Sequence, residues 1–206
     1  MSDPALQVIS VEEYLRTEQE SPVKREYVDG FVYPLHGATR AQAGTSKAHM
    51  RITLNFVLAL DTKATRAGCR LYAADMKLRI EGKNSFYYPD VMVACGQDNG
   101  EEYYETDPCL LVEVLSKRTA AIDRHAKYHA YTSIPSLQMY LIVSQSERRI
   151  LAYQRAGDGW RLTQYGGTGS ISLACLGHTL TLDEVYRGVI DPAGSAATGS
   201  GTPPQA

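Results

Sequence analysis

The chain has 206 residues, of which 44% are hydrophobic and 21% are charged, and these values exclude a fibrous or largely disordered protein. The formal net charge of −2 argues against a protein that coats nucleic acid by bulk charge. No apolar run approaches the ~18 residues that a membrane-spanning helix needs. Met1–Ser10 lacks the basic and apolar regions of a secretory signal, so we expect a cytoplasmic protein.

Four cysteines are widely scattered along the chain and form no Cys-x-x-Cys pair. In a cytoplasmic protein this spacing favours reduced, buried thiols over a disulfide framework or a zinc knuckle. The four are Cys69, Cys95, Cys109 and Cys175.

The N-terminal third predicts two helices and a hairpin. Ser10 and Glu13 have the spacing of a capping box, which starts a short helix that ends near Glu20. Asp29-Gly30 is a hairpin turn signal within residues 26–33. A longer helix is expected to start at Thr45 or Ser46, run through residue 60 or beyond and stop before residue 68, a glycine. Its apolar residues at helical spacing are Met50, Leu54, Val57, Leu58 and Ala64.

The centre of the chain predicts three strands, a helix and a further strand. The segments are 69–80, 87–95 and 109–115 for the strands, 119–131 for the helix and 137–143 for the last strand. Together with the preceding long helix, the order is helix, strand, strand, strand, helix, strand. Elements in this order form an α/β fold with a mixed sheet and helices packed on its faces.

The C-terminal third predicts additional strands and a short helix. Segments 149–155 and 160–165 flank Gly157-Asp158-Gly159, which is typical of a hairpin, and residues 181–189 form a final helix. Residues 191–206 contain much Ala, Gly, Ser and Pro and no large apolar side chain, so we expect a disordered tail. The whole therefore indicates one domain over residues 1–190.

Charge is unevenly distributed. Residues 38–87 hold nine Lys or Arg and three Asp or Glu, whereas residues 88–113 hold seven acids and no base. A basic stretch beside an acidic one suits phosphate binding next to cation binding. The alternative is an unevenly charged surface in contact with water.

Two acids lie inside strongly apolar segments. Asp90 occurs in Tyr-Tyr-Pro-Asp-Val-Met-Val, and Glu113 occurs in Leu-Leu-Val-Glu-Val-Leu. A buried carboxylate without a partner costs several kcal/mol, so such acids need a cation nearby. If both lie at one strand edge, their oxygens make a hard site suited to Mg²⁺ or Mn²⁺. The alternative is that each acid pairs with a nearby Arg or Lys.

These segments carry a resemblance to a known family. Tyr-Tyr-Pro-Asp-Val-Met-Val-Ala-Cys, Leu-Leu-Val-Glu-Val-Leu-Ser-Lys-Arg-Thr and Asp-Arg-His-Ala-Lys-Tyr (123–128) together resemble the Uma2 family, which is grouped with the PD-(D/E)XK endonucleases. The resemblance covers about residues 10–189. It implies a restriction-endonuclease-like core in the helix–strand order given above.

The resemblance also implies site residues. Asp90 and Glu113 match the two metal ligands of the superfamily. The usual lysine two residues after the glutamate is absent, because Leu115 stands there. Family members place a lysine on the following helix instead, and Lys127 matches that position. Lys117 is the competing candidate, because its even spacing from Glu113 keeps it on the same strand face.

Four further residues are candidates for the site. Glu26 can add a third carboxylate, or it can pair with its basic neighbours on a strand surface. His49, at the start of the long helix, can contact a phosphate or serve the structure alone. Lys77 and Arg79 share a strand face that lines either a substrate groove or solvent.

The combined hypothesis is a Mg²⁺- or Mn²⁺-dependent endonuclease that hydrolyses DNA. The missing lysine and the mild negative charge keep a second hypothesis open: a non-catalytic relative with the same fold that binds nucleic acid or protein. The same site could also hydrolyse another phosphate ester. RNA as substrate and a homodimer both stay open. The chain lacks the GxxxxGK[ST] and GxGxxG patterns, so nucleotide-driven and dinucleotide-dependent chemistry are not expected.

Overall fold

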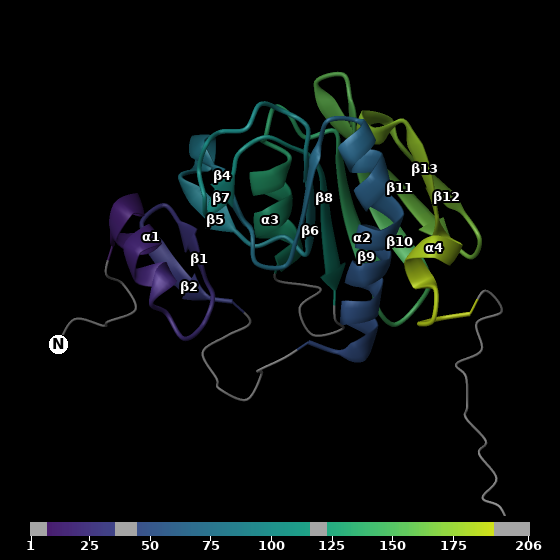
Figure 1. Cartoon of the computed structure of the whole chain (residues 1–206), viewed down its shortest axis with the longest axis horizontal. Helices are drawn as coiled ribbons and strands as arrows, with labels where there is room; N and C mark the ends of the chain where they lie inside the picture. The colour runs from purple at the N-terminus through teal and green to yellow at the C-terminus, as the bar shows by residue number, and fades with distance from the viewer. Residues whose placement is uncertain (1–7, 36–44, 116–122, 192–206) are drawn as a thin grey trace, which may run out of the picture.

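Within the part of the chain that the structure describes, six strands form the central sheet, in the order β11-β10-β9-β8-β6-β3. The computed structural model describes residues 8–35, 45–115 and 123–191 (Figure 1). β8 and β9 are parallel, and every other neighbouring pair in this sheet is antiparallel. The strands are β3 (Arg70–Ala73), β6 (Val91–Ala94), β8 (Pro108–Leu115), β9 (Met139–Ser144), β10 (Arg149–Ala156) and β11 (Gly159–Gly166).

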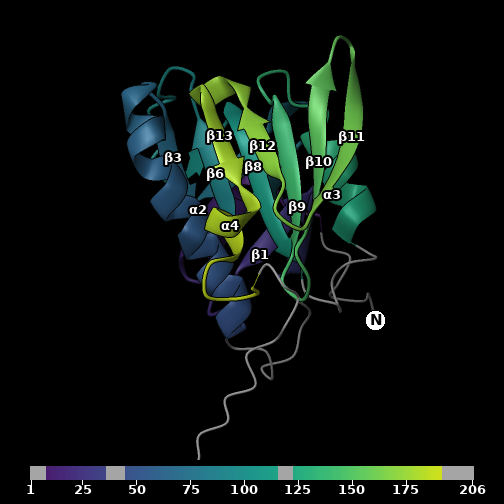
Figure 2. The same ribbon diagram turned by 90° about the vertical axis from the view of Figure 1, so that its right-hand side faces the viewer.

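Both faces of this sheet are covered (Figure 2). One face packs against α2 (Lys47–Arg66), α4 (Leu182–Tyr186) and the small sheet of β12 (Ser170–Leu173) and β13 (His178–Thr181), which the short helix η4 (Ala174–Leu176) connects. The other face packs against α3 (Asp123–Tyr131). Strands covered on both faces are apolar throughout, which explains the composition of β8 and β9.

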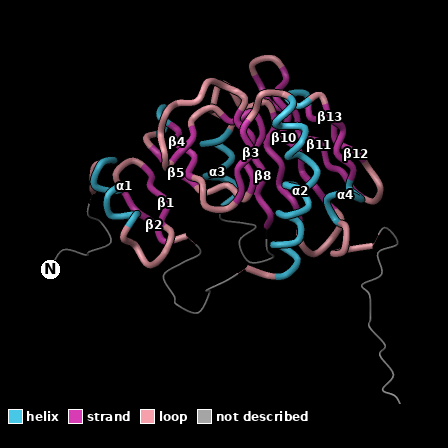
Figure 3. The backbone as a smooth tube through the Cα atoms, in the orientation of Figure 1, coloured by secondary structure: helices cyan, strands magenta, loops and turns pink. Residues whose placement is uncertain are grey.

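A second sheet lies on the α3 side, with the order β2-β1-β5-β4-β7. Its outer face packs against α1 (Val11–Gln19), which lies beside β1 and β2 in Figure 3. The contact is made by buried aromatic rings, namely Tyr14, Tyr27 and Phe86. The strands are β1 (Arg25–Val28), β2 (Phe31–Pro34), β4 (Lys77–Ile80), β5 (Ser85–Tyr87) and β7 (Tyr104–Glu105), and a short helix η3 (Glu81–Lys83) joins β4 to β5.

The predicted fold class is confirmed. The expected order of helix, three strands, helix and strand corresponds to α2, β3, β6, β8, α3 and β9. α3 carries the chain from β8 to the parallel neighbour β9, as a parallel pair requires.

The predicted starts and turns are also confirmed. Ser10 caps α1 by accepting a hydrogen bond from the backbone of Glu13, and Ser46 caps α2 in the same way through His49. The turns expected at Asp29-Gly30 and at residues 157–159 join β1 to β2 and β10 to β11. Thr181 forms a full capping box at the start of the last helix.

Two segments expected to be single strands are each divided between the two sheets. Residues 69–80 form β3 and β4, which Ala74 separates with a φ of 65° and a backbone hydrogen bond to Asp90. Residues 87–95 divide at Tyr88-Pro89, where proline removes a backbone donor and ends the ladder. The alternation of apolar residues shifts by one position at Ala73-Ala74, from 69, 71 and 73 to 76, 78 and 80, and this shift was the available signal for the first division.

The buried face of α2 differs from the predicted one. Met50, Leu54 and Leu58 are exposed, whereas Ile52, Phe56 and Leu60 pack in the core. Both sets recur every four residues, because this helix is apolar on more than one face. Helical periodicity alone therefore could not identify the face that packs against the sheet.

The expectation of four separate, reduced thiols is wrong. The structure brings the sulfurs together and pairs Cys69 with Cys95 and Cys109 with Cys175. None of the helices in the described ranges combines the length and hydropathy of a membrane span. The tail expected at 191–206 lies outside the described residues beyond residue 191.

Candidate active site

Asp90 and Glu113 lie side by side at one end of the central sheet. β6 and β8 are antiparallel and pair Val91 with Val112, so the next positions, Asp90 and Glu113, lie opposite each other. Directly opposite residues of an antiparallel pair project from the same face. The side chain of Asp90 is 22% exposed and that of Glu113 is 7% exposed. The pair therefore has one accessible and one buried member.

Asp90 is held by two groups. Its Oδ2 accepts a hydrogen bond from the backbone N–H of Val114 at 2.7 Å, and its Oδ1 lies 3.1 Å from Nε2 of His49. His49 is in the first turn of α2 and points back toward the sheet. Burial lowers the pKa of His49. The hydrogen bond to Asp90 and the negative charge of Asp90 together raise this pKa by more, so the net shift is upward. An imidazolium beside Asp90 is therefore favoured.

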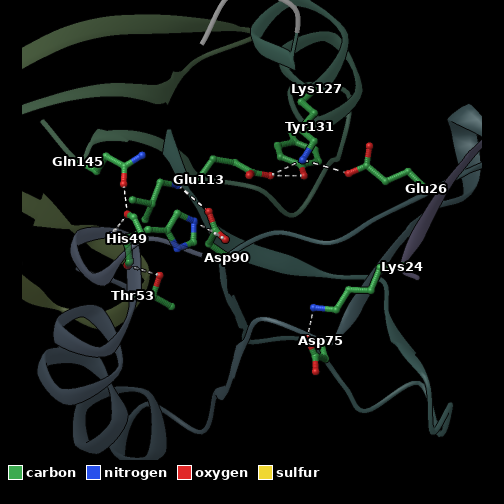
Figure 4. Close-up of polar contacts among 12 residues, drawn as sticks. Lys24, Glu26, His49, Thr53, Asp75, Asp90, Glu113, Lys127, Tyr131 and Gln145 are labelled. Atoms are coloured by element: carbon green, nitrogen blue, oxygen red, sulfur yellow. Dashed lines mark hydrogen bonds and ion pairs between the residues drawn. The ribbon is translucent and has the colours of Figure 1, made fainter. Parts of the chain in front are cut away.

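Lys127 lies between two acids. Its Nζ is 3.1 Å from Oε1 of Glu113 and 3.1 Å from Oε1 of Glu26. The lysine comes from α3 and is 6% exposed, and Glu26 comes from β1 in the second sheet. The consecutive elements β8 and α3 and the sequence-distant β1 thus meet at one ammonium group (Figure 4).

Tyr131 also belongs to this cluster, although the sequence analysis assigned it no role. Its hydroxyl donates a 2.7 Å hydrogen bond to Oε1 of Glu113. Its ring packs edge-on against Tyr87 and Tyr140, with centroids 5.6 and 5.1 Å away. Tyr131 lies one helical turn after Lys127 in α3, and this spacing is the sequence signal that could have placed it in the site.

The buried carboxyl group of Glu113 has a strongly perturbed pKa. Burial raises the pKa, Lys127 lowers it and the charge of Asp90 raises it, with a net value of about 7. The negative charge on Glu113 is therefore only partly compensated by the side chains around it. Additional positive charge next to Asp90 and Glu113 would favour the ionised form.

The donor chemistry of this pair fits a divalent cation. Two carboxylates project from the same face of neighbouring strands, and Asp90 is accessible enough to exchange with solvent. Carboxylate oxygens are the ligands that Mg²⁺ and Mn²⁺ favour. Lys127 and His49 supply further positive charge on either side.

The structure places Lys77 and Arg79 elsewhere. Lys77 is buried, donates to the backbone oxygen of Tyr103 at 3.4 Å and lies over the Tyr88 ring. Arg79 stacks on the Phe86 ring at 4.6 Å. Their strand β4 turns this face toward the α1 side, while the alternate residues pack with α3. Lys117, the competitor of Lys127, lies outside the described residues.

Comparison with known proteins identifies relatives of this chain. The family model named Uma2, described as "Putative restriction endonuclease", matches residues 11–183. The uncharacterized protein slr1290 of Synechocystis is 34% identical over 183 residues, which is 88% of this chain and 93% of the relative. A second Synechocystis protein, the uncharacterized sll1609, is 33% identical over 164 residues, covering 78% of this chain and 89% of the relative.

A solved structure has the same fold. It is the crystal structure of a putative nuclease belonging to DUF820 from Anabaena variabilis, with a TM-score of 0.65 and 14% sequence identity. The similarity covers 86% of this chain and 97% of that one. At this identity the comparison concerns the arrangement of the elements alone.

Proposed function

The chain belongs to the Uma2 family, and on that premise we propose that it is a nuclease that hydrolyses phosphodiester bonds of DNA with Mg²⁺ or Mn²⁺ as cofactor. The observation that carries the proposal is the cluster of Asp90, Glu113 and Lys127. These residues combine two oxygen ligands with a buried ammonium group at the end of a sheet. The pattern matches what phosphodiester hydrolysis needs: a held cation and positive charge where the phosphate gains negative charge.

Asp90 and Glu113 are the proposed ligands of the cation. When bound, the cation supplies charge that lowers the pKa of a water molecule and stabilises the transition state. The hydrogen bond from the backbone of Val114 orients the carboxylate of Asp90. The hydroxyl of Tyr131 orients the carboxylate of Glu113. Both acids are therefore fixed before substrate arrives, which reduces the reorganisation that the reaction requires.

Lys127 is the proposed positively charged catalytic residue. Its contacts with Glu113 and Glu26 hold the ammonium group within the cluster, and burial strengthens its field. In this position it can orient the attacking water or neutralise a non-bridging phosphate oxygen. This role replaces the lysine that the superfamily places where Leu115 stands here.

His49 is the proposed contact for a phosphate oxygen at the open side of the site. It lies next to the more accessible acid, Asp90, and its raised pKa favours the charged form. A charged imidazole can donate to a phosphate as well as to a carboxylate. Glu26 is proposed to hold Lys127 in place rather than to contact substrate.

A cleavage assay tests the proposal. The full chain is incubated with supercoiled, linear and single-stranded DNA and with RNA, in Mg²⁺, in Mn²⁺ and without divalent cation. We expect cleavage of DNA that requires the cation. Asp90→Asn is expected to abolish it, whereas Glu101→Gln, in an exposed acidic loop, is expected to leave it unchanged.

Two results would overturn the proposal. Cleavage that persists in Asp90→Asn would show that the activity belongs to another site or to a contaminant. Nucleic-acid binding without cleavage in any cation would favour the non-catalytic alternative.

A further inference from the structure

The four cysteines of the chain meet in one cluster, away from the candidate active site. The structure pairs Cys69 with Cys95 and Cys109 with Cys175, and the Sγ atoms of Cys95 and Cys109, one from each pair, are 3.2 Å apart. The sulfurs of Cys95, Cys109 and Cys175 all lie within 4.8 Å of one another. The pairs are separated by 26 and 66 residues in sequence, so the fold and not local spacing creates the cluster.

Three adjacent strand ends and one short helix position the sulfurs. β3 and β6 pair Arg70 with Ala94, so Cys69 and Cys95, the next residues outward, lie opposite each other. The ladder between β6 and β8 shifts register after Val93, which brings the start of β8 and Cys109 alongside. η4 carries Cys175 onto the same apolar face. Three of the cysteines thus lie at the ends of adjacent strands, and the fourth lies in η4. Packing of these elements in the main core holds the four side chains in place.

The contact between the two pairs distinguishes this cluster from two independent disulfides. Two separate cross-links have no need to lie within van der Waals contact of each other. Three sulfurs in mutual reach, with the fourth bonded to one of them, supply the four donors of a tetrahedral metal site, in which Zn–S bonds of about 2.3 Å place the sulfurs about 3.8 Å apart.

Accessibility also fits a metal site. Cys69 and Cys109 are 8% and 3% exposed, whereas Cys95 and Cys175 are partly exposed. The two buried cysteines make the site rigid, and the two partly exposed cysteines give the ion a path of entry. The side chain of Arg70 donates to the backbone oxygens of Gly96 and Gln97, and so fixes the loop that follows Cys95.

We propose that, when a small thiol reductant opens both disulfides, the four cysteines bind one Zn²⁺ ion as a structural site. Four reductant thiols supply four electrons and four protons and pair as two disulfides of their own, and the two cysteine disulfides become four thiols. Each cysteine thiol then loses its proton to solvent, and its sulfur donates an electron pair to the zinc. Soft thiolate ligands select zinc over the Mg²⁺ or Mn²⁺ proposed for the acids.

The zinc site is too far from the acids to take part in phosphate chemistry. β6 (Val91–Ala94) separates Asp90 from Cys95, and β8 (Pro108–Leu115) contains both Cys109 and Glu113. Four or five strand residues span about 13–17 Å. The ion would therefore clamp β3, β6, β8 and η4 together at the end of the sheet opposite the acids.

Zinc content and cobalt spectroscopy test the proposal. The full chain is purified under reducing conditions with Zn²⁺, separated from free metal and analysed for zinc and for reactive thiols. We expect about one zinc per chain, and we expect Co²⁺ replacement to give the charge-transfer and visible bands of a tetrahedral thiolate site. Cys95→Ser and Cys175→Ser, chosen because these cysteines are the more exposed, should each reduce zinc to less than about a tenth per chain. Ser172→Ala, on the neighbouring strand β12, should bind zinc normally.

A measurement on the unaltered chain guards against variants that fail to fold. Removing zinc with a chelator should expose four reactive thiols and lower the melting temperature by several degrees, because the ion binds the folded state. Two results would overturn the proposal: four reactive thiols with no bound zinc, or a mass four daltons below the reduced chain that persists in reductant, which indicates two stable disulfides. Zinc binding in Asp90→Asn separates this result from failure of the proposed nuclease function.

Discussion

The two ends of strand β6 carry different chemistry. At its start, Asp90 and its neighbour Glu113 gather an imidazole and an ammonium group around two carboxylates. At its end, Cys95 joins three other cysteines within the apolar core. The acidic end keeps its charges buried only because cations lie next to them, whereas the sulfur end, with its cysteines paired in disulfides, buries neutral groups at little cost. The comparison teaches that the two ends of one pair of strands can bury their side chains by different means: compensation of charge at one end and neutral cross-links at the other.

Glu113→Gln is the sharpest test of whether the acidic end and the cysteine end of these strands act independently. The amide keeps the shape and the hydrogen bond from Tyr131 but loses the negative charge that the cation needs. We expect DNA cleavage to fall by about 10³-fold, as for other groups that stabilise transition-state charge. Zinc at the cysteine cluster should be unchanged, and metal analysis of the same preparation checks this. Loss of both properties would show that the two ends are not independent.

Lys127→Met should have the next largest effect. It removes the ammonium group between Glu26 and Glu113 and leaves two acids without that cation. Cleavage should fall by about 10²-fold, and the free energy of unfolding should fall by about 3 kcal/mol, because a buried pair loses one partner. Urea unfolding and the cleavage assay measure the two losses.

Two further variants complete the lysine test. Lys127→Arg should keep most of the stability, since it keeps the charge. Lys83→Met, at an exposed position in η3, should alter neither property. A stable, fully active Lys127→Met variant would remove Lys127 from the site.

Tyr131→Phe should produce a smaller loss. The substitution keeps the edge-on packing against Tyr87 and Tyr140 but removes the hydrogen bond to Glu113. Because that bond favours the ionised acid, its loss raises the pKa of Glu113 further and shifts the pH profile of cleavage upward. We expect about 10-fold lower activity at neutral pH, from about 1.4 kcal/mol. Tyr103→Phe, at an exposed tyrosine, serves as the control, and an unshifted profile would contradict the role.

The smallest expected effect is a dependence of the free energy of unfolding on pH. The pKa of Glu113 is raised from 4.5 to about 7 in the folded chain, so the folded state holds this proton more tightly than the unfolded state. The contribution of this group to the free energy of unfolding is then fully present below pH 4.5 and is lost as pH rises through about 7. Urea unfolding between pH 5 and 8, without added divalent cation, measures the decline. The slope should be smaller in Glu113→Gln, and an equal slope in both chains would assign it to other groups.

The acidic end was largely predictable from the sequence. Acids within apolar strands are unusual, and the spacing of α3 places Lys127 and Tyr131 on one face. The positions of Lys77 and Arg79 were not predictable, because they depend on the division of residues 69–80 between two sheets at Ala74. Alternation fixes which residues share a face but not which face meets the site.

The cysteine cluster was not predictable from spacing. Its members come from different elements, and a register shift between β6 and β8 sets the position of Cys109. Register depends on long-range pairing of strands, which leaves no local signal in the sequence. The buried face of α2 was missed for a related reason, because the choice between two apolar stripes is made by the sheet and not by the helix.

No two residues of the candidate site are neighbours in sequence. Glu26, His49, Asp90, Glu113 and Lys127 come from five separate segments, and the second sheet and the first must both be assembled before they meet. A nascent chain therefore cannot complete the cluster until residue 127 has emerged and folded, and a proteolytic fragment that lacks any one segment loses part of it. The proposed hydrolysis would then be a property of the finished fold alone, and an incomplete copy of the chain would leave nucleic acid intact.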